Sequence, residues 1–396
     1  MSTKISNIFK GIFSAKIMTV LEGVVIIPLA IALFFALTSI PVASFGSMFA
    51  MMTLLMSILS VILLAISTGL FFVSKTKPRR MILIAAAVMT LSSLIVTGSN
   101  LFVASKEDVS INYRDAFGGR ANIKADVEID SYYQFDGEDI GLSLWTPKNT
   151  TEPAPIVVFI HGGGWASGDR FMKYVTGHCQ YFADKGYLTV SIDYPLSTDD
   201  RHLWDKQEEI VGRAVAWVAE HAKEYGGDKD QIFLTGESAG GNLAINVATR
   251  INNGSIGEII GQEIPSIKAI AALYPATEPT IVYYDADPLY KPTLLDLLHK
   301  HFGGSPEEYP ERYYAITSMN IVDKENTPPV LLVYGNRDHY VPIQSTKQFI
   351  NDMEEKEITY KTVVVPFSDH VFDMLPGCLG AQIYEQASLN WFEQFP

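Results

Sequence analysis

Three long apolar stretches dominate the first 104 residues of this 396-residue chain. They span about 17–40, 47–73 and 81–103, and the only charged side chain within them is Glu22. Each stretch is long enough to cross a hydrocarbon core about 30 Å thick, which takes about 20 helical residues. Helices of a soluble bundle would carry polar faces at helical spacing, and these stretches carry none. The sequence therefore predicts a membrane domain at 1–104 with three transmembrane helices.

Charge separates this region from the rest of the chain. Of the 30 basic and 44 acidic residues, only seven and one fall within 1–104, so 105–396 carries a net charge of about −20. An acidic domain without a basic patch repels nucleic acid, which excludes nucleic acid as a partner. About 290 residues suffice for one well-buried core. We therefore expect 105–396 to form one acidic soluble domain.

The loops between the apolar stretches predict an orientation in the membrane. Three lysines precede the first stretch, and the link at 74–80 carries four basic residues. The link at 41–46 carries none. Because basic loops stay in the cytoplasm, the N-terminus and 74–80 are expected there, and three crossings place 105–396 outside the cell. Cleavage of the first stretch as a signal peptide would leave that location unchanged.

From residue 126 onward, strand-like runs alternate with amphipathic helical stretches such as 207–224. A leading hairpin is expected at 126–145, with its turn at Asp136-Gly137. Several later runs are almost continuous Val, Ile and Leu, which is typical of parallel strands covered on both faces. The prediction is a mostly parallel α/β sheet with helices on both faces. The later strand-like runs are 156–160, 188–193, 231–235, 267–273, 330–334 and 360–365.

Ser238 lies in the pattern G-x-S-x-G, between the strand-like run QIFLTG and the helical run AGGNLAINVATR. Gly236 and Gly240 allow the strand and the helix to approach closely at a sharp turn that exposes the hydroxyl. The dipole of the following helix favours negative charge at that point. We interpret Ser238 as a nucleophile; the alternative is an ordinary helix cap.

A serine nucleophile needs a base, and the base needs an acid that orients it. Asp338 and His370 each follow one of the last two strand-like runs, where open α/β sheets place their chemistry. The chain order Ser, Asp, His is that of the α/β-hydrolases. His339 and Asp369 are their neighbours, and they stay open as a substrate contact and a rival acid.

The run HGGGW at 161–165 follows another strand and precedes Ser238 in the chain. Acyl transfer creates a negative oxygen that needs preorganised N–H donors. Gly163 and Gly164 are the expected donors, because a Cβ would block the turn and the approach of substrate, and Ala239 is the expected third. His161 is expected to hold the loop by hydrogen bonds, and Glu237 to support the nucleophile.

HGGGW, GESAGG and the following Asp and His together resemble bacterial carboxylesterases of the hormone-sensitive-lipase-like group. The resemblance is strongest to the subgroup that includes acetylxylan and feruloyl esterases, and it covers roughly 126–395. It implies the α/β-hydrolase fold and ester hydrolysis by Ser238, His370 and Asp338. Pro195 and Met319 depart from the family pattern, which has Arg and Pro there, and the family pattern does not account for the membrane helices. Further matching runs are SIDYPLS, HFGGSPEEYPERYYAITSM and VPIQST.

The sequence thus predicts a membrane-anchored serine carboxylesterase whose catalytic domain is extracellular. No metal or organic cofactor is expected, and the substrate is a small-molecule, saccharide or lipid ester. The connection at 276–304 is long enough to form a partial cover. It is too short for a deep tunnel, so short acyl groups, acetyl to butyryl, are expected. The candidate pocket walls are aromatic: Trp165, Tyr194, Tyr340, Phe367 and Phe372.

Other functions stay open at this point. One is a lipid-directed hydrolase that works at the membrane surface. An acyltransferase and a non-catalytic membrane partner are further alternatives. The alcohol part of the substrate, the oligomeric state and a Cys179–Cys378 bridge also stay open.

Overall fold

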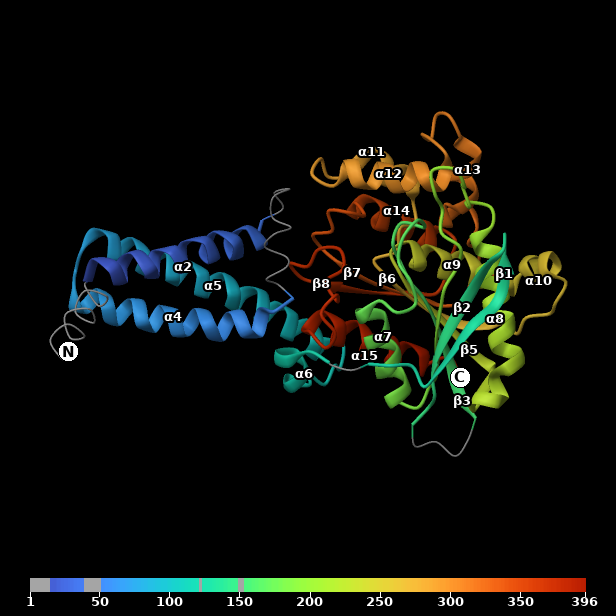
Figure 1. Ribbon diagram of the computed structural model, residues 1–396, viewed down its shortest axis with the longest axis horizontal. Coiled ribbons are helices and arrows are strands. Elements are labelled where there is room, and N and C mark those ends of the chain that lie inside the picture. Colours follow the sequence, from blue (N-terminus) through green and yellow to red (C-terminus); the bar gives the residue numbers. More distant parts are fainter. Residues whose placement is uncertain (1–14, 39–50, 121–122, 149–152) are drawn as a thin grey trace. The chain divides into compact units, whose positions relative to one another are not determined.

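A computed structural model gives the structure of the chain (Figure 1). It forms two compact units, Met1–Phe102 and Val103–Pro396. Lys4, Lys10 and the predicted loop at 41–46 lie outside the described residues. The structure describes residues 15–38, 51–120, 123–148 and 153–396.

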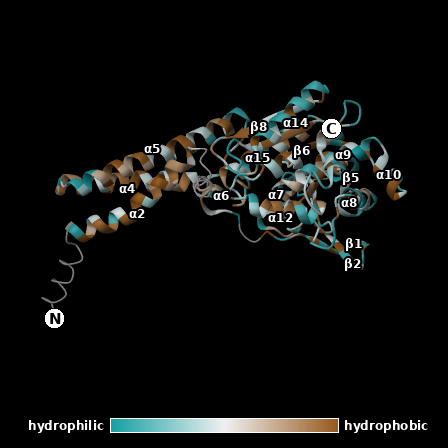
Figure 2. Ribbon diagram, turned by 90° about the horizontal axis from the view of Figure 1, so that it is seen from above, coloured by the Kyte–Doolittle hydropathy of each residue, from teal (hydrophilic) through white to brown (hydrophobic). Residues whose placement is uncertain are grey.

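The first unit contains three helices that are long and apolar enough to cross a membrane: α2 (Ala15–Ala36), α4 (Thr53–Val73) and α5 (Lys77–Lys106). Figure 2 shows hydrophobic residues along most of their length. Helix α5 begins before the predicted start at 81, because Pro78 is well placed in a first helical turn.

A seam of hydroxyl groups joins α4 to α5, although the sequence had shown no polar face there. The Oγ atom of Ser57 lies 2.8 Å from Oγ1 of Thr97, and Oγ of Ser60 lies 2.8 Å from Oγ of Ser93. Thr90 donates to the carbonyl of Ser60 at 3.0 Å. Such hydroxyls hold apolar helices together without a wide polar stripe, which is why hydropathy alone misses them.

The second unit is built on one eight-stranded sheet in the order β1-β2-β4-β3-β5-β6-β7-β8. The pairs β1–β2 and β2–β4 are antiparallel, and the other neighbours are parallel. The mostly parallel sheet and its leading hairpin are confirmed. The strands are β1 (Val127–Phe135), β2 (Glu138–Trp145), β3 (Ala154–Ile160), β4 (Leu188–Ile192), β5 (Gly227–Glu237), β6 (Ile267–Leu273), β7 (Val330–Gly335) and β8 (Tyr360–Val365).

Helices cover both faces of the sheet, and alternate strand residues divide between the two cores, as the pleat requires. Val158 of β3 joins the core under α8 (Gln207–His221), α9 (Ala239–Asn252) and α14 (Ile343–Glu355). Its neighbour Phe159 joins the other core, under α7 (Lys173–Asp184) and α15 (Leu379–Phe392), which lie side by side (Figure 1). This layering brings the C-terminal ends of the parallel strands to one edge.

Shorter helices lie in the connections. The predicted cover at 276–304 contains α11 (Pro279–Asp285) and α12 (Lys291–Phe302). Cys179 and Cys378 are both free and buried. The remaining short helices are α6 (Tyr113–Gly118), α10 (Ser255–Ile260) and α13 (Pro310–Ile316).

Candidate active site

Ser238 occupies the turn between β5 and α9 with φ 52° and ψ −119°. Few residues other than glycine adopt a positive φ, and such strain is concentrated at functional sites. A Cβ on Gly236 would overlap the carbonyl oxygen of Gly240, and a Cβ on Gly240 would overlap that of Ile160. The two glycines therefore permit the turn that lifts the Ser238 hydroxyl clear of the sheet.

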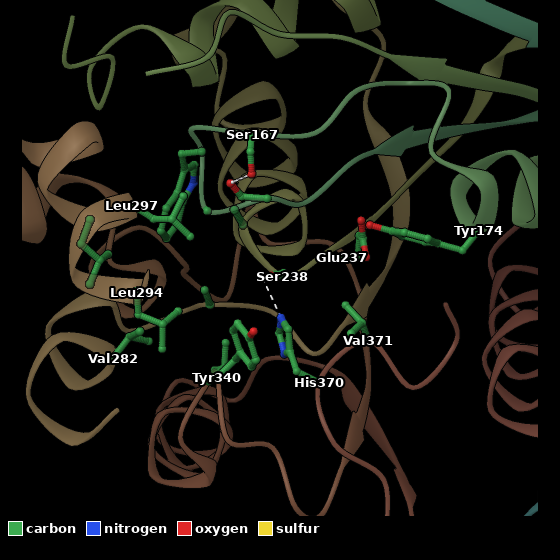
Figure 3. A pocket seen from close by; sticks show the side chains of 17 residues that line it. Ser167, Tyr174, Glu237, Ser238, Val282, Leu294, Leu297, Tyr340, His370 and Val371 are labelled. Carbon is green, nitrogen blue, oxygen red and sulfur yellow. Dashed lines mark hydrogen bonds between the residues drawn. The ribbon is translucent and has the colours of Figure 1, made fainter. Parts of the chain in front are cut away.

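The structure brings Ser238, His370 and Asp338 together, and Figure 3 shows the contact between Ser238 and His370. The Nε2 atom of His370 lies 3.0 Å from Oγ of Ser238, and its Nδ1 lies 2.7 Å from Oδ2 of Asp338. The other oxygen of Asp338 accepts backbone N–H groups from Tyr340 at 2.9 Å and Val341 at 2.8 Å. A carboxylate on Nδ1 places the ring proton there and leaves Nε2 free to accept the serine proton.

Two opposing effects set the pKa of His370. Burial lowers it, but the charge of Asp338 and its hydrogen bond outweigh burial, so the pKa lies above the ordinary value of 6.5. The imidazole is enclosed beside a carboxylate that stabilises its charged form.

The glycines of the HGGGW run form a tight loop after β3. Gly163 has φ 110° and Gly164 has φ 60°. A Cβ on Gly163 would overlap the carbonyl oxygen of Ser167, and one on Gly164 would lie 2.7 Å from Cδ1 of Leu297. Both glycines line the same cavity as Ser238, and their N–H groups make no hydrogen bond with any described residue. They are therefore available to a ligand.

Ala239 supplies a third N–H group at this cavity. It is the first residue of α9, where backbone amides lack a partner within the helix. Unpaired amides beside the Ser238 hydroxyl are the arrangement that stabilises a negatively charged oxygen.

His161 and Glu237 hold the glycine loop from below. His161 Nδ1 lies 2.8 Å from the carbonyl oxygen of Gly162, and the imidazole stacks on Tyr194 with centroids 4.4 Å apart. The Gly162 N–H donates to Oε1 of Glu237 at 3.0 Å. The structure thus places both residues where the sequence had suggested, in contact with the loop.

The cavity in front of Ser238 has a volume of about 250 Å³. The predicted cover forms much of its wall, and Figure 3 shows these apolar side chains across the cavity from Tyr174. The leucines of α12 were not singled out from the sequence, although their i, i+3, i+4 spacing marks one helix face. The wall residues from the cover are Ala276, Val282, Leu294, Leu297 and Leu298.

Trp165 and Tyr340 line the cavity among the five expected aromatic walls, and Tyr340 stacks on His370 with centroids 5.4 Å apart. The other three do not line it, which corrects the expectation for them. Tyr194 is buried below the glycine loop and donates to the His161 carbonyl at 2.9 Å.

Phe372 packs in the core, with its ring 5.4 Å from that of Tyr274. The ring of Phe367 lies against the guanidinium of Arg337. Both aromatic side chains therefore serve packing away from the cavity, and proximity to His370 in the sequence did not predict their direction.

Asp369, the rival acid, pairs with His339, the candidate substrate contact. Oδ2 of Asp369 lies 2.7 Å from Nδ1 of His339, and its Oδ1 accepts the N–H groups of His339 and His370, each at 2.8 Å. Asp369 thus ties together the two loops that carry Asp338 and His370. The imidazole of His370 hydrogen-bonds with Asp338 instead. Within the described ranges, no cluster of three or more His, Cys, Asp or Glu could hold a metal ion.

The sheet order, the turn at Ser238 and the position of the cavity define the second unit as an α/β-hydrolase fold. A solved structure has the same fold. Inhibited esterase B from Lactobacillus rhamnosis superposes on this chain with a TM-score of 0.58 at 23% identity, and the superposition covers 76% of this chain and 94% of that one. The BD-FAE family model matches residues 142–353, and the chain belongs to this family.

Two curated relatives from Mycobacterium tuberculosis are similar over the same region. The probable carboxylic ester hydrolase LipM is 30% identical over 247 residues, which is 61% of this chain and 55% of the relative. Esterase LipC is 26% identical over 244 residues, or 60% of this chain and 58% of the relative. The chain thus spans somewhat more than half the length of these relatives.

Proposed function

We propose that this chain is a serine carboxylesterase. The observation that supports this most directly is a pair of contacts. Ser238 Oγ lies 3.0 Å from His370 Nε2, and His370 Nδ1 lies 2.7 Å from Asp338 Oδ2. Unpaired amides lie beside them. The carboxylic ester hydrolases LipM and LipC among its relatives support the same reaction.

Each part of the site has a role in this reaction. Ser238 attacks the ester carbonyl while His370 takes its proton, and Asp338 stabilises the resulting imidazolium. The carbonyl oxygen becomes negative and accepts hydrogen bonds from the amides of Gly163, Gly164 and Ala239. His370 then protonates the departing alcohol. A water molecule, activated by the same imidazole, releases the acid and restores the serine.

The proposed substrates carry short acyl groups. A cavity of about 250 Å³ is smaller than the roughly 300–1,000 Å³ of pockets that enclose drug-sized ligands. Its apolar wall on α12 lies against the glycine loop, so an acyl chain meets Leu297 close to the reacting carbon. Longer chains would leave methylenes unburied and forfeit about 0.8 kcal/mol for each. The alcohol part of the ester, a saccharide or a small alcohol, extends out of the cavity.

The proposed location is the cell membrane, with the hydrolase unit outside. The length and apolar composition of α2, α4 and α5 support this, as do the basic residues at 74–80. Protease added to intact cells should digest the hydrolase unit and spare 74–80. A C-terminal reporter that works only in the cytoplasm would refute this orientation.

The activity is tested with the full chain in detergent and aryl esters from acetyl to dodecanoyl. Wild-type protein should prefer acetyl to butyryl esters by kcat/KM, and Ser238→Ala should lose at least ~10³-fold in kcat. Ser131→Ala is the control, since this exposed serine of β1 does not line the cavity. Turnover by Ser238→Ala close to wild type would remove Ser238 from its role.

A lipid-directed hydrolase is separated from this proposal by repeating the series in lipid nanodiscs. A preference for chains of ten or more carbons in both detergent and nanodiscs would refute the short-acyl assignment.

A further inference from the structure

A buried chain of hydrogen bonds leads from Glu237 into the interior. Tyr274 Oη lies 2.9 Å from Oε2 of Glu237 and 2.5 Å from Oδ1 of Asp373. The second oxygen of Asp373 lies 2.9 Å from Nε2 of His178, whose Nδ1 lies 2.9 Å from Oε1 of Glu385. All five side chains are at least nine-tenths buried. None of the four beyond Glu237 has a role in the reaction above.

The far end of this chain is a paired charge. Arg120 donates to both oxygens of Glu385, at 2.6 and 2.8 Å, and to Asp115 at 3.0 Å. A bidentate pair of this kind is strong and geometrically specific. It fixes Glu385 as an ionised acceptor, and the protons along the rest of the chain can be counted from there.

Proton counting makes His178 an imidazolium. Each of its ring nitrogens faces a carboxylate oxygen at 2.9 Å, so each must carry a hydrogen. Its pKa agrees: burial lowers it, but the hydrogen bonds and charges of Asp373 and Glu385 raise it to about 9. His178 therefore donates to Oδ2 of Asp373, and an imidazolium at 2.9 Å favours a carboxylate there over a second proton.

The same count leaves one proton missing at Tyr274. Its hydroxyl has a single hydrogen but lies between two carboxyl groups. The shorter contact, to Asp373, takes that hydrogen. The contact of 2.9 Å to Glu237 is then a hydrogen bond only if Glu237 carries a proton on Oε2 and donates it to the tyrosine oxygen. Oε1 of Glu237 still accepts the Gly162 N–H.

We propose that the active state of this enzyme carries a proton on Glu237, and that Tyr274, Asp373 and His178 hold it there. The proposal rests on the proposed function, because a neutral Glu237 matters for the negatively charged oxygen that forms during ester hydrolysis. An ionised carboxylate adjacent to Ser238 would oppose negative charge developing at the glycine loop, whereas a neutral one still positions Gly162. Glu237 is thus a positioning residue for the glycine loop.

The surroundings of Glu237 favour the neutral form near neutrality. Burial and the negative charge of Asp373 raise its pKa to about 7, against the hydrogen bond from the Gly162 N–H and the contacts with Tyr174 and Tyr274. Figure 3 shows the Tyr174 hydroxyl beside the Glu237 carboxyl group. A raised pKa means that the proton is present below it and lost above it, so the active form declines as pH rises. The ionisable groups facing Glu237 are Tyr174, Tyr194, Tyr274, His370 and Asp373.

Infrared difference spectra between acid and alkaline pH test the proton directly. The full chain in detergent should show the carbonyl band of a buried protonated carboxyl group that disappears at alkaline pH. Glu237→Gln should remove the part of this absorption that comes from Glu237. Glu278→Gln is the matched control. Glu278 takes no part in these hydrogen bonds, and burial raises its pKa as well, to about 8. The Glu237 band must persist in this control.

Kinetics supply the second measurement. Glu237→Ala should lower kcat ~30-fold with little change in KM, and Glu237→Gln, which keeps a neutral acceptor for Gly162, should recover most of that loss. The glutamine variant should also lose the alkaline decline of the wild-type profile. Asp373→Asn should move that decline to lower pH, because it removes the charge that keeps the proton on Glu237.

Either of two results would overturn the assignment: the same carboxyl absorption in Glu237→Gln as in wild type, or the same alkaline decline in Glu237→Gln as in wild type. A wild-type chain that shows the band but hydrolyses no ester would refute the proposed function and leave the protonated Glu237 standing.

Discussion

Leu297 of α12 is the side chain through which the cover should set the acyl preference. It lines the cavity, and its Cδ1 would lie 2.7 Å from a Cβ placed on Gly164. Leu297→Ala removes three carbon atoms from the wall of a cavity of about 250 Å³, which makes room for about three methylenes. Burial of one methylene contributes about 0.8 kcal/mol, or roughly fourfold in kcat/KM.

We therefore expect the hexanoyl-to-butyryl ratio of kcat/KM to rise by up to ~15-fold in Leu297→Ala, since two methylenes separate the esters. Partial collapse of the cover would lower this figure. The assay is the aryl-ester series in detergent with each purified variant. Leu295→Ala is the control, because it lies on the same helix but does not line the cavity. An unchanged ratio in Leu297→Ala, or an equal rise in Leu295→Ala, would refute an acyl site beside α12.

Three further predictions address the site and its cover. Gly163→Ala should lower kcat ~10²–10³-fold, because its Cβ displaces an N–H donor; a matched loss after Gly186→Ala, a positive-φ glycine with open space around it, would indicate general strain instead. Activity should fall with decreasing pH through a pKa above 6.5, since protonated His370 cannot accept the serine proton, and an acid limb at or below 6.5 would contradict this. Burial and Asp352 raise the pKa of Glu278 to about 8, so stability should decrease from about pH 4.5 to pH 8 as the unfolded chain ionises first; denaturant unfolding at both pH values should show this loss, and it should be smaller in Glu278→Gln than in wild type.

The strands and the turn at Ser238 could be predicted because their signals are local. Apolar runs of five to seven residues identify buried parallel strands, and G-x-S-x-G between a strand and a helix leaves few geometries for the serine. Chain order then supplied Asp338 and His370, since parallel strands bring their C-terminal ends to one edge.

The cavity wall could not be predicted in the same way. Trp165 and Phe372 both lie close in sequence to proposed catalytic groups, yet only Trp165 lines the cavity. Side-chain direction in these loops depends on tertiary packing, which the sequence period does not encode. Leu297 was missed for a similar reason, because its role depends on how α12 folds back over the glycine loop.

The buried chain behind Glu237 depends even more on packing, since His178 and Glu385 are 207 residues apart and meet only because α7 packs beside α15. From Arg120 inward its charges alternate through Glu385, His178 and Asp373, and these four buried charges cancel if Glu237 is neutral; Asp115, which also pairs with Arg120, is partly exposed to solvent. An ionised Glu237 would add an unpaired negative charge in the interior, where desolvation makes such a charge costly. Charge balance therefore agrees with the state that proton counting assigns. In that state the buried chain adds no net charge behind Ser238, and Asp338 is left as the carboxylate that hydrogen-bonds with the imidazole of His370.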